Sequence, residues 1–239
     1  MRIGGRGMKV VNHMPFKDIL KITQMAVSRF RDCGLTRIGG GKFGDVYLYI
    51  DSNSQKYAIK VWKVYYDNED HDIENLLRLQ GSKYFPKIYM YKKRSFLVME
   101  YFDGRTLAEI FSKHDRERAD KIGKPAIKYI HDGNKSIEEA FKFAVSRGLA
   151  PNDTHGNNII VTKEGELKFI DVGLFEELKV RYHRWHDYNG KVVYNNNKDL
   201  VESIKRDITN CFELEYAKGQ YQSAFNALVE QQAKELASI

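Results

Sequence analysis

Residues 151–173 read PNDTHGNNIIVTKEGELKFIDVG, and the interpretation of the rest of the chain starts from this stretch. Two short apolar runs, at 159–161 and 167–170, flank the turn-like residues 163–166. Apolar segments on either side of a short polar turn are typical of two antiparallel strands. The sequence therefore predicts a β-hairpin that places the polar residues before and after it at its two ends.

Three polar side chains flank this hairpin at spacings suited to phosphoryl transfer. Asp153 could orient a hydroxyl group and take its proton, and Asn158 and Asp171 could hold one or two Mg²⁺ ions. Phosphoryl transfer needs such groups, because it depends on positioning and charge neutralisation more than on covalent chemistry. Asp and Asn are also common in turns, so the interpretation depends on the residues upstream.

A glycine-rich loop lies upstream, where residues 38–47 read IGGGKFGDVY. Glycines allow the backbone to lie close over phosphates, so that its N–H groups can face their oxygens. A dinucleotide-binding loop has the same spelling but opens a helix, whereas residues 46–50 read VYLYI and are typical of a strand. The loop is therefore expected to cap a hairpin, with the pattern G-x-G-x-x-G-x-V formed by Gly39, Gly41, Gly44 and Val46.

A lysine follows on the second strand of that hairpin. After a turn at 51–54, residues 56–62 read KYAIKVW. Ile59 and Val61 point to the opposite face of the strand from Lys60. A charged side chain on such an apolar strand either reaches solvent or has a functional role. Beside a glycine loop, the functional interpretation is that Lys60 binds the phosphates of ATP.

The order of these motifs resembles that of the protein-kinase superfamily. The shared order is the glycine loop, Ala58-Ile59-Lys60, an acidic helix, the segment VMEY at 98–101, Asp-x4-Asn and Asp-x-Gly. The resemblance covers residues 35–175. It implies an α+β, bilobal, protein-kinase-like fold with ATP and Mg²⁺ as cofactors.

The resemblance also implies a division of the chain into three parts. Residues 1–30 are an N-terminal extension, with a flexible lead followed by an amphipathic helix predicted from apolar residues spaced by three and four. That helix either packs on the following sheet or docks a partner. Residues 31–101 are the N-lobe, with a small antiparallel sheet and one main helix. Residues 102–239 are a reduced, mostly helical C-lobe that lacks a full activation segment.

The acidic helix of the N-lobe is predicted over residues 67–81, which begin with helix-capping residues and end at glycine. Its inner face is marked by four side chains, those of Ile73, Leu76, Leu77 and Gln80. By resemblance, Glu74 beside that face is the partner of Lys60, and Glu69 is the alternative.

Further site residues follow from the resemblance alone. Met99 looks like the gatekeeper, and Glu100, Tyr101 and Phe102 look like the hinge, whose backbone would bond the adenine edge. The residues expected at the nucleotide are Ile38, Gly39, Gly41, Gly44, Val46, Ala58, Lys60, Met99, Glu100 and Tyr101. The expected catalytic residues are Asp153, Lys60 and Glu74, and the expected metal ligands are Asn158 and Asp171.

The catalytic loop departs from the protein-kinase pattern. Pro151-Asn152 stands in place of His-Arg before the aspartate, and the missing arginine argues against control by a phosphorylated activation loop. His155 gives the spelling Asp-x-His-x-x-Asn, which looks like that of aminoglycoside and choline phosphotransferases. Asp171-Val172-Gly173 keeps the metal ligand of Asp-Phe-Gly but not its aromatic residue. The reduced C-lobe is similar to that of minimal kinases found among bacterial secreted effectors and some bacterial cytosolic kinases.

More helices are expected in the C-lobe. Two capping-box spellings, beginning at Thr106 and Ser136, predict helix starts. Residues 113–133 are highly charged and form either a loop or an extra helix with a basic surface. Apolar spacing predicts two more helices, at 200–212 and 221–236.

Composition narrows the class of protein. The chain has 239 residues, a net charge of +7 and 42% hydrophobic residues, which fits one large domain or two small lobes. It has no apolar run long enough for a transmembrane helix and no apolar core of a secretory signal at its N-terminus. Cys33 and Cys211 make neither a disulfide framework nor a metal site, which fits a reducing cytosol. The likeness to effector kinases adds export into a host cell as an alternative.

Three functions remain open. The first is ATP- and Mg²⁺-dependent transfer to Ser or Thr of a protein substrate, for which the basic balance favours an acidic or host-type partner surface. The second is a small-molecule phosphotransferase, favoured by His155. The third is a pseudokinase that holds a partner through its basic face. No recognised nucleic-acid motif is present, so nucleic acid is not expected as a partner. The sequence leaves the oligomeric state open.

Overall fold

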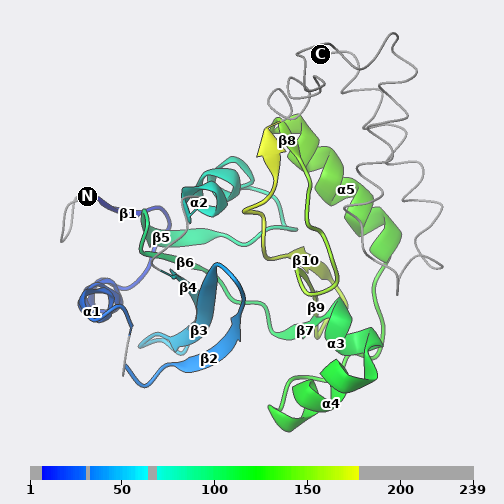
Figure 1. Cartoon of the computed structure of the whole chain (residues 1–239), viewed down its shortest axis with the longest axis horizontal. Coiled ribbons are helices and arrows are strands. Elements are labelled where there is room, and N and C mark those ends of the chain that lie inside the picture. The colour runs from blue at the N-terminus through cyan, green and yellow to red at the C-terminus, as the bar shows by residue number, and fades with distance from the viewer. Residues whose placement is uncertain (1–6, 31–32, 64–68, 178–239) are drawn as a thin grey trace, which may run out of the picture. The chain divides into compact units, whose positions relative to one another are not determined.

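The computed structural model describes residues 7–30, 33–63 and 69–177 (Figure 1). The chain divides into two compact units, the first made of Met1–Gly81 with Pro86–Tyr101 and the second of Ser82–Phe85 with Phe102–Ile239. The predictions for Cys211, for helices at 200–212 and 221–236, and for residues 178–239 of the reduced C-lobe lie outside the described residues. Within the described ranges, no helix is long and apolar enough to cross a membrane.

The first unit is built on a six-stranded antiparallel sheet, which confirms the antiparallel N-terminal sheet expected from the sequence. The strands lie in the order β1-β5-β6-β4-β3-β2. Their bounds are β1 Met8–Val10, β2 Thr36–Gly40, β3 Gly44–Ile50, β4 Lys56–Trp62, β5 Ile88–Lys92 and β6 Phe96–Glu100. Two helices accompany them, α1 Phe16–Val27 and α2 Glu69–Arg78 (Figure 1).

The helix α1 packs on one face of this sheet. Its buried residues Ile19, Ile22 and Met25 join Tyr57 and Ile59 of β4 in one hydrophobic core. Because side chains alternate along a strand, Lys60 points to the opposite face. There it meets α2, so the two helices cover opposite faces of the sheet. Of the two interpretations of the N-terminal helix, packing on the sheet is therefore confirmed.

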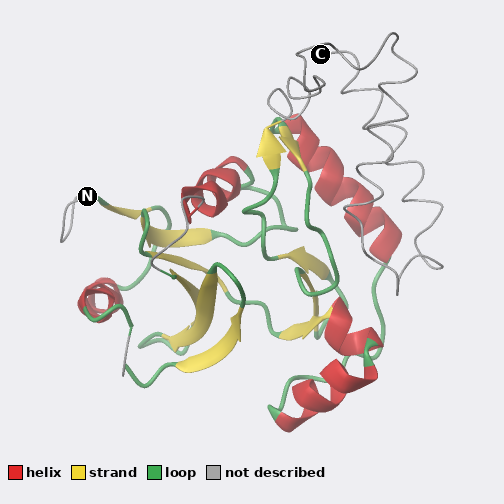
Figure 2. Ribbon diagram, viewed as in Figure 1, coloured by secondary structure: helices red, strands yellow, loops and turns green. Residues whose placement is uncertain are grey.

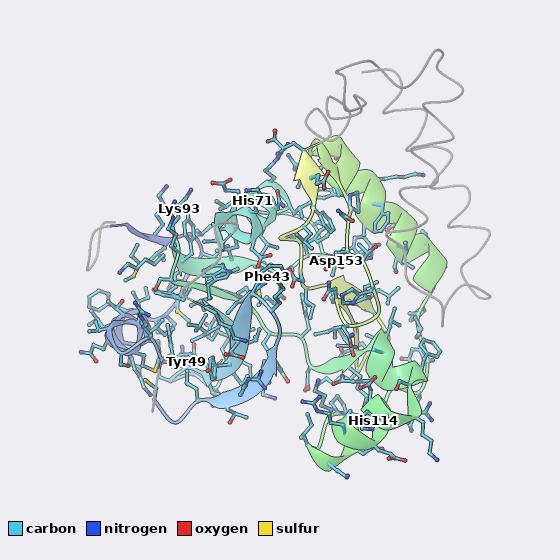
Figure 3. The ribbon with its side chains drawn as sticks, in the orientation of Figure 1. Phe43, Tyr49, His71, Lys93, His114 and Asp153 are labelled. Carbon is cyan, nitrogen blue, oxygen red and sulfur yellow. The ribbon has the colours of Figure 1, made fainter. Side chains whose placement is uncertain are left out.

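A buried carboxylate fastens α1 to the sheet. Asp18, 4% exposed, accepts hydrogen bonds from the hydroxyl of Tyr49 at 2.5 Å and from that of Ser52 at 2.9 Å (Tyr49 is labelled in Figure 3). Burial alone raises the pKa of Asp18, but the hydrogen bonds from Tyr49 and Ser52 outweigh it, so the pKa lies below its ordinary value of 3.8. Burial and the same bond to Asp18 raise the pKa of Tyr49.

The flexible lead predicted for the first fifteen residues is wrong for part of its length. Met8–Val10 form β1, an edge strand that pairs with β5 in the register Met8↔Lys92. The backbone N–H of Val11 continues this pairing with a hydrogen bond to the carbonyl of Tyr89 at 2.8 Å. A pairing with residues so far along the chain leaves no local signal in so short a stretch.

In its described part, residues 82–85 and 102–177, the second unit holds a small sheet and three helices. Its three-stranded sheet has the order β10-β9-β7, and β11 pairs with β8. The strands are β7 Gly104–Thr106, β8 Leu149–Ala150, β9 Ile159–Thr162, β10 Leu167–Phe169 and β11 Glu176–Glu177. The helices are α3 Leu107–Phe111, α4 Lys113–Lys121 and α5 Gly133–Ser146, of which α5 is the long helix in Figure 2.

The hairpin predicted at 159–170 is confirmed as β9 and β10, which pair in the register Val161↔Leu167. Gly165 lies in its turn with φ +86°, a conformation that favours glycine. Beneath the hairpin, aromatic rings form the core of the unit. The ring of Phe169 lies 5.7 Å from that of Phe85 and 5.6 Å from that of Phe141 on α5, measured between centroids.

One predicted helix start in this unit is right and one is wrong. Thr106 and Glu109 form the expected capping box, because each side chain accepts a hydrogen bond from the other's backbone N–H, at 3.1 and 2.9 Å. The helix expected to begin at Ser136 begins earlier, at Gly133. The backbone N–H of Ser136 already donates to the carbonyl of Asp132, so Ser136 lies within the first turn and does not cap it.

Candidate active site

Four residues predicted at the nucleotide share one face of the first sheet. Val46 is the cross-strand partner of Lys60, and Ala58 is the partner of Met99. Directly opposed residues point to the same face, so these four side chains lie on the face that α2 covers. Lys60 is 8% exposed and Met99 is 5% exposed. The sheet register thus assembles an apolar surface around a single buried ammonium group.

Asp72 is the acid that pairs with Lys60. The ammonium of Lys60 donates a hydrogen bond to Oδ2 of Asp72, and both side chains are nearly buried, at 10% and 6% exposure. The prediction that Glu74 is the partner is wrong, because Glu74 points outward and pairs with Lys93 at 2.8 Å. The side chain of Glu69, the alternative, lies outside the described residues.

The error comes from the rotational register of α2. Its buried apolar residues are Ile73 and Leu76, followed by the buried Leu79 just beyond its end, whereas Leu77, predicted on the inner face, is 37% exposed. Successive residues turn by about 100°, so Asp72 shares the inner face and Glu74 lies on the far side of the helix. The hydrogen bond from Lys93 lowers the pKa of Glu74 in that outer position.

The glycine loop is a tight hairpin whose tip is held by a lysine. The N–H of Gly41 donates to the carbonyl of Gly44 at 2.9 Å. The ammonium of Lys63, just beyond β4, donates to the carbonyl of Gly41 at 2.8 Å, and its backbone N–H donates to the carbonyl of Phe43. Sequence reasoning missed Lys63, because no motif contains it and only the strand pairing brings it to the loop.

The three glycines of the pattern differ in how tightly they are packed. A methyl group on Gly44 would lie 2.6 Å from the carbonyl oxygen of Val61, so Gly44 is required by the approach of β3 to β4. A methyl group added to Gly41 would have no atom within 4 Å, and one added to Gly39 would meet only the Cβ of Val46, at 3.8 Å. In this structure Gly41 therefore has no packing reason to be glycine.

Of the remaining residues expected at the nucleotide, Ile38 lies in the middle of β2, Glu100 ends β6, and Tyr101 follows it. Ile38 is half-buried at an irregularity in the pairing of β2 with β3. The N–H of Glu100 donates to the carbonyl of Lys87 at 2.9 Å, so this group is already used within the sheet. The ring of Tyr101 lies under the ammonium of Lys56, 5.5 Å from nitrogen to centroid.

In the second unit, Asp153 is fixed in the loop between β8 and β9 (Figure 3). It adopts φ +56°, an uncommon conformation for a residue with a side chain. Its N–H donates to Oδ1 of Asn152 at 2.9 Å. The amide of Asn158 donates to the carbonyl of Asp153 at 2.8 Å and to its carboxylate at 3.2 Å. The loop thus brings together the predicted base and one predicted metal ligand.

His155 completes this cluster. Its Nδ1 accepts a hydrogen bond from the backbone N–H of Asn157 at 3.2 Å, which leaves the proton of the neutral ring on Nε2. Nε2 lies 3.6 Å from Oδ1 of Asp153 and 3.4 Å from the amide nitrogen of Asn158. The imidazole N–H therefore faces the carboxylate of Asp153.

The two predicted metal ligands lie at the open end of the β9–β10 hairpin. The N–H of Ile170 donates to the carbonyl of Asn158 at 2.9 Å, which continues the strand pairing by one step and makes Asp171 the next residue beyond that pair. Oδ1 of Asp171 accepts a bond from the N–H of Gly173 at 3.3 Å. An amide oxygen and a carboxylate are hard oxygen donors of the kind that Mg²⁺ takes, alongside water and phosphate oxygens.

Two further features of the catalytic loop were not predicted. Among the described residues, the hydroxyl of Thr154 is buried without a hydrogen-bond partner, and Thr154 is 2% exposed. The carbonyl of Gly156 accepts a bond from the N–H of Ala108 at 3.1 Å, which ties the loop to the start of α3. In the described part of the chain, no group of three or more His, Cys, Asp or Glu residues could hold a metal. A metal here would therefore depend on Asn158 and Asp171 with non-protein ligands.

Comparison with known proteins gives a consistent result. Residues 34–234 match the family described as protein kinase domain. One relative, named "Putative serine/threonine-protein kinase YrzF" in Bacillus subtilis strain 168, is 31% identical over 154 residues, which are 64% of this chain and 65% of that protein. Myosin-IIIa of Mus musculus is 27% identical over 161 residues, 62% of this chain and 10% of that protein. Serine/threonine-protein kinase STE20 of Debaryomyces hansenii is 28% identical over 152 residues, 60% of this chain and 13% of that protein. The matches thus span less than two thirds of each relative.

Proposed function

Because the chain belongs to the protein kinase domain family, we propose that it transfers the γ-phosphoryl group of ATP to a serine or threonine hydroxyl of a protein. The observation that supports this proposal is the loop of the second unit, in which the amide of Asn158 donates to the carbonyl and the carboxylate of Asp153. The bond from the N–H of Ile170 to the carbonyl of Asn158 brings the backbone before Asp171 to the same end of the hairpin. Two of the relatives are named as serine/threonine-protein kinases, which supports this choice of acceptor.

In this proposal the first unit binds the nucleotide. The face that carries Val46, Ala58 and Met99 takes the adenine, and the ammonium of Lys60 neutralises phosphate oxygens. Asp72 holds Lys60 in place, because a buried ammonium without a partner would be costly and poorly oriented. The backbone N–H groups of the glycine loop add neutral donors to the same phosphates.

The second unit supplies the chemistry at the acceptor. Asn158 and Asp171 would hold Mg²⁺, which supplies charge neutralisation at the transferring phosphate. Asp153 orients the acceptor hydroxyl and takes its proton as the oxygen forms a bond to phosphorus and the bond to the leaving ADP oxygen breaks. The amide of Asn158, donating to the carboxylate of Asp153, fixes the direction in which that base points.

A small-molecule hydroxyl is the second candidate acceptor. The observation in its favour is His155, which lies against Asp153 in the spelling Asp-x-His-x-x-Asn. An ATP turnover assay against separate protein and metabolite pools distinguishes the two acceptors, because only the pool that holds the acceptor stimulates ADP release.

The test of the proposed function is transfer of ³²P from γ-labelled ATP to a mixture of proteins, followed by phosphoamino-acid analysis. Wild-type protein is expected to yield phosphoserine or phosphothreonine, and Asp153→Asn to lower the rate about 10²- to 10⁴-fold, the usual contribution of a general base. Asp103→Asn, a change of a half-buried aspartate whose carboxylate lies 3.8 Å from the ammonium of Lys163, serves as the control, since Asp103 is not one of the predicted site residues. If the ³²P label appeared only in small molecules, the acceptor would be a small molecule and not a protein. Equal rates in wild type and Asp153→Asn would remove Asp153 as the base.

A further inference from the structure

The outer side of α1 carries an apolar stripe that the fold of the first unit does not use. Phe16, Leu20 and Val27 are 54%, 41% and 86% exposed. With 3.6 residues per turn, the three positions fall within an arc of about 40° around the helix axis. This stripe is separate from Ile19, Ile22 and Met25, which face the sheet. Together, Phe16, Leu20 and Val27 are called the outer stripe below.

Cationic side chains border the outer stripe. Lys17 and Lys21 are exposed and lie on the next part of the helix surface. The one acidic residue of α1, Asp18, is buried and bonded to Tyr49 and Ser52, and it attracts Lys17. The ammonium of Lys21 lies 5.7 Å from the centroid of the Tyr49 ring. The solvent-facing side of α1 therefore combines apolar and positive groups without an exposed carboxylate of its own.

The helix is also held rigidly before it meets any partner. Asp18 is bonded to two side chains of the β3–β4 region, and Ile22 is fully buried in the core. Binding through the outer stripe would thus require no folding step, and the ordering cost that lowers the affinity of flexible segments would be small.

We propose that the outer stripe, with Lys17 and Lys21, is a docking surface for an anionic lipid membrane. A helix with Phe and Leu beside lysines is suited to the boundary between headgroups and acyl chains, where apolar burial and charge attraction act together. The function proposed above is not needed for this inference.

A second copy of the chain fits this surface less well. Three partly exposed side chains on a twelve-residue helix offer far less than the ~800 Å² per partner of a standard protein interface. In a two-fold dimer through α1, Lys17 and Lys21 of one copy would also face the same lysines of the other. A lipid surface has no such area requirement and carries the opposite charge.

The test is co-sedimentation of the whole chain with two kinds of vesicle, phosphatidylcholine alone and the same lipid with about a third phosphatidylserine. Binding is expected to the anionic vesicles only and to weaken as salt is raised. Lys17→Gln and Lys21→Gln are each expected to weaken binding about fivefold, since each removes one cation at the surface. Phe16→Ser and Leu20→Ser are expected to weaken it about five- to tenfold.

The matched controls lie away from α1. Ile122, 61% exposed, and Lys128, also exposed, offer the same kinds of side chain in the second unit, and Ile122→Ser and Lys128→Gln are expected to bind as the wild type does. Tryptophan fluorescence of Leu20→Trp is a second measurement, and it needs no destabilising substitution. The emission of this tryptophan is expected to shift to shorter wavelength when anionic vesicles are added. Equal binding to both vesicles, no binding to either, or no effect of the α1 variants would overturn the proposal. Self-association lost in Phe16→Ser would also overturn it, in favour of a second copy.

Discussion

Lys60 and Asp72 form a buried ion pair between β4 and α2, whereas Glu74, two residues further along the helix, pairs with Lys93 at the surface. The two acids thus differ in burial as well as in partner. The side chain of Asp72 is 6% exposed and that of Glu74 is 54% exposed. This difference allows two similar substitutions on one helix to serve as experiment and control.

Asp72→Asn is expected to lower both stability and activity. Removing the charge breaks a buried ion pair, which typically costs about 3–5 kcal/mol in the free energy of unfolding. Misplacing Lys60 is expected to slow phosphoryl transfer about 100-fold. Urea denaturation and ³²P transfer measure the two effects.

The control for that prediction is Glu74→Gln, which removes an exposed pair and is expected to change stability by less than about 1 kcal/mol and to leave the rate of transfer unchanged. A larger loss of activity in Glu74→Gln than in Asp72→Asn would show that Glu74 is the functional partner of Lys60.

The carboxylate of Asp18 is expected to make stability depend on pH in the acid range. Because its pKa is lower in the folded chain than its ordinary value of 3.8, the unfolded chain binds its proton first as pH falls. The stabilisation from Asp18 is therefore complete above the ordinary value and is lost as pH falls through the lower, folded value.

Urea denaturation of wild type and Asp18→Asn between neutral pH and about pH 3 checks this sign. The stability difference between the two proteins is expected to be constant near neutral pH and to shrink below about pH 4. A difference that grows as pH falls would mean that Asp18 is protonated in the folded chain.

Substitutions of two glycines in the loop are expected to distinguish an effect on packing from an effect on ligand binding. Gly44→Ala should destabilise the first unit by about 1–3 kcal/mol, because the added methyl group meets the backbone of Val61. Gly41→Ala should leave the melting temperature unchanged, because that position is open. If the loop covers phosphates, Gly41→Ala should instead raise KM for ATP. An unchanged KM in a stable Gly41→Ala protein would argue against close approach of this part of the loop.

His155→Ala tests whether the imidazole orients Asp153. The ring N–H faces the carboxylate, so its loss is expected to lower kcat about 10- to 100-fold, the range expected for a misplaced catalytic group. KM for ATP should be little changed, because in the proposed function His155 acts at the acceptor, whereas the first unit binds the nucleotide. A change in KM alone would assign His155 to nucleotide binding.

The elements that the sequence predicted well are those with local signals. The hairpins β3–β4 and β9–β10 combine alternating or β-branched residues with polar turns, and both form as expected. The capping box at Thr106 is also local, because its two partners are three residues apart. In these cases the chemistry of neighbouring residues determines the structure, so single-sequence reasoning is sufficient.

The elements that were missed depend on partners far along the chain. The strand β1 exists through its pairing with β5, and β7 through its pairing with β9. The rotation of α2 was wrong because its sequence offers two overlapping apolar stripes, one with Leu77 and one with Leu79, and packing on the sheet selects the second. That choice also decides between Asp72 and Glu74, so the same ambiguity carried over into the candidate site. Lys63 was missed for a similar reason, since only the fold brings it to the loop.

The most direct test of the central claim is the rate of ³²P transfer from γ-labelled ATP by wild type, Lys60→Ala and Asp171→Ala at saturating Mg²⁺, with folding verified by circular dichroism. If a buried lysine of the first unit and a carboxylate of the second act in one phosphoryl transfer, both variants should be folded and transfer no label above background. Transfer at the wild-type rate in both folded variants would contradict the account.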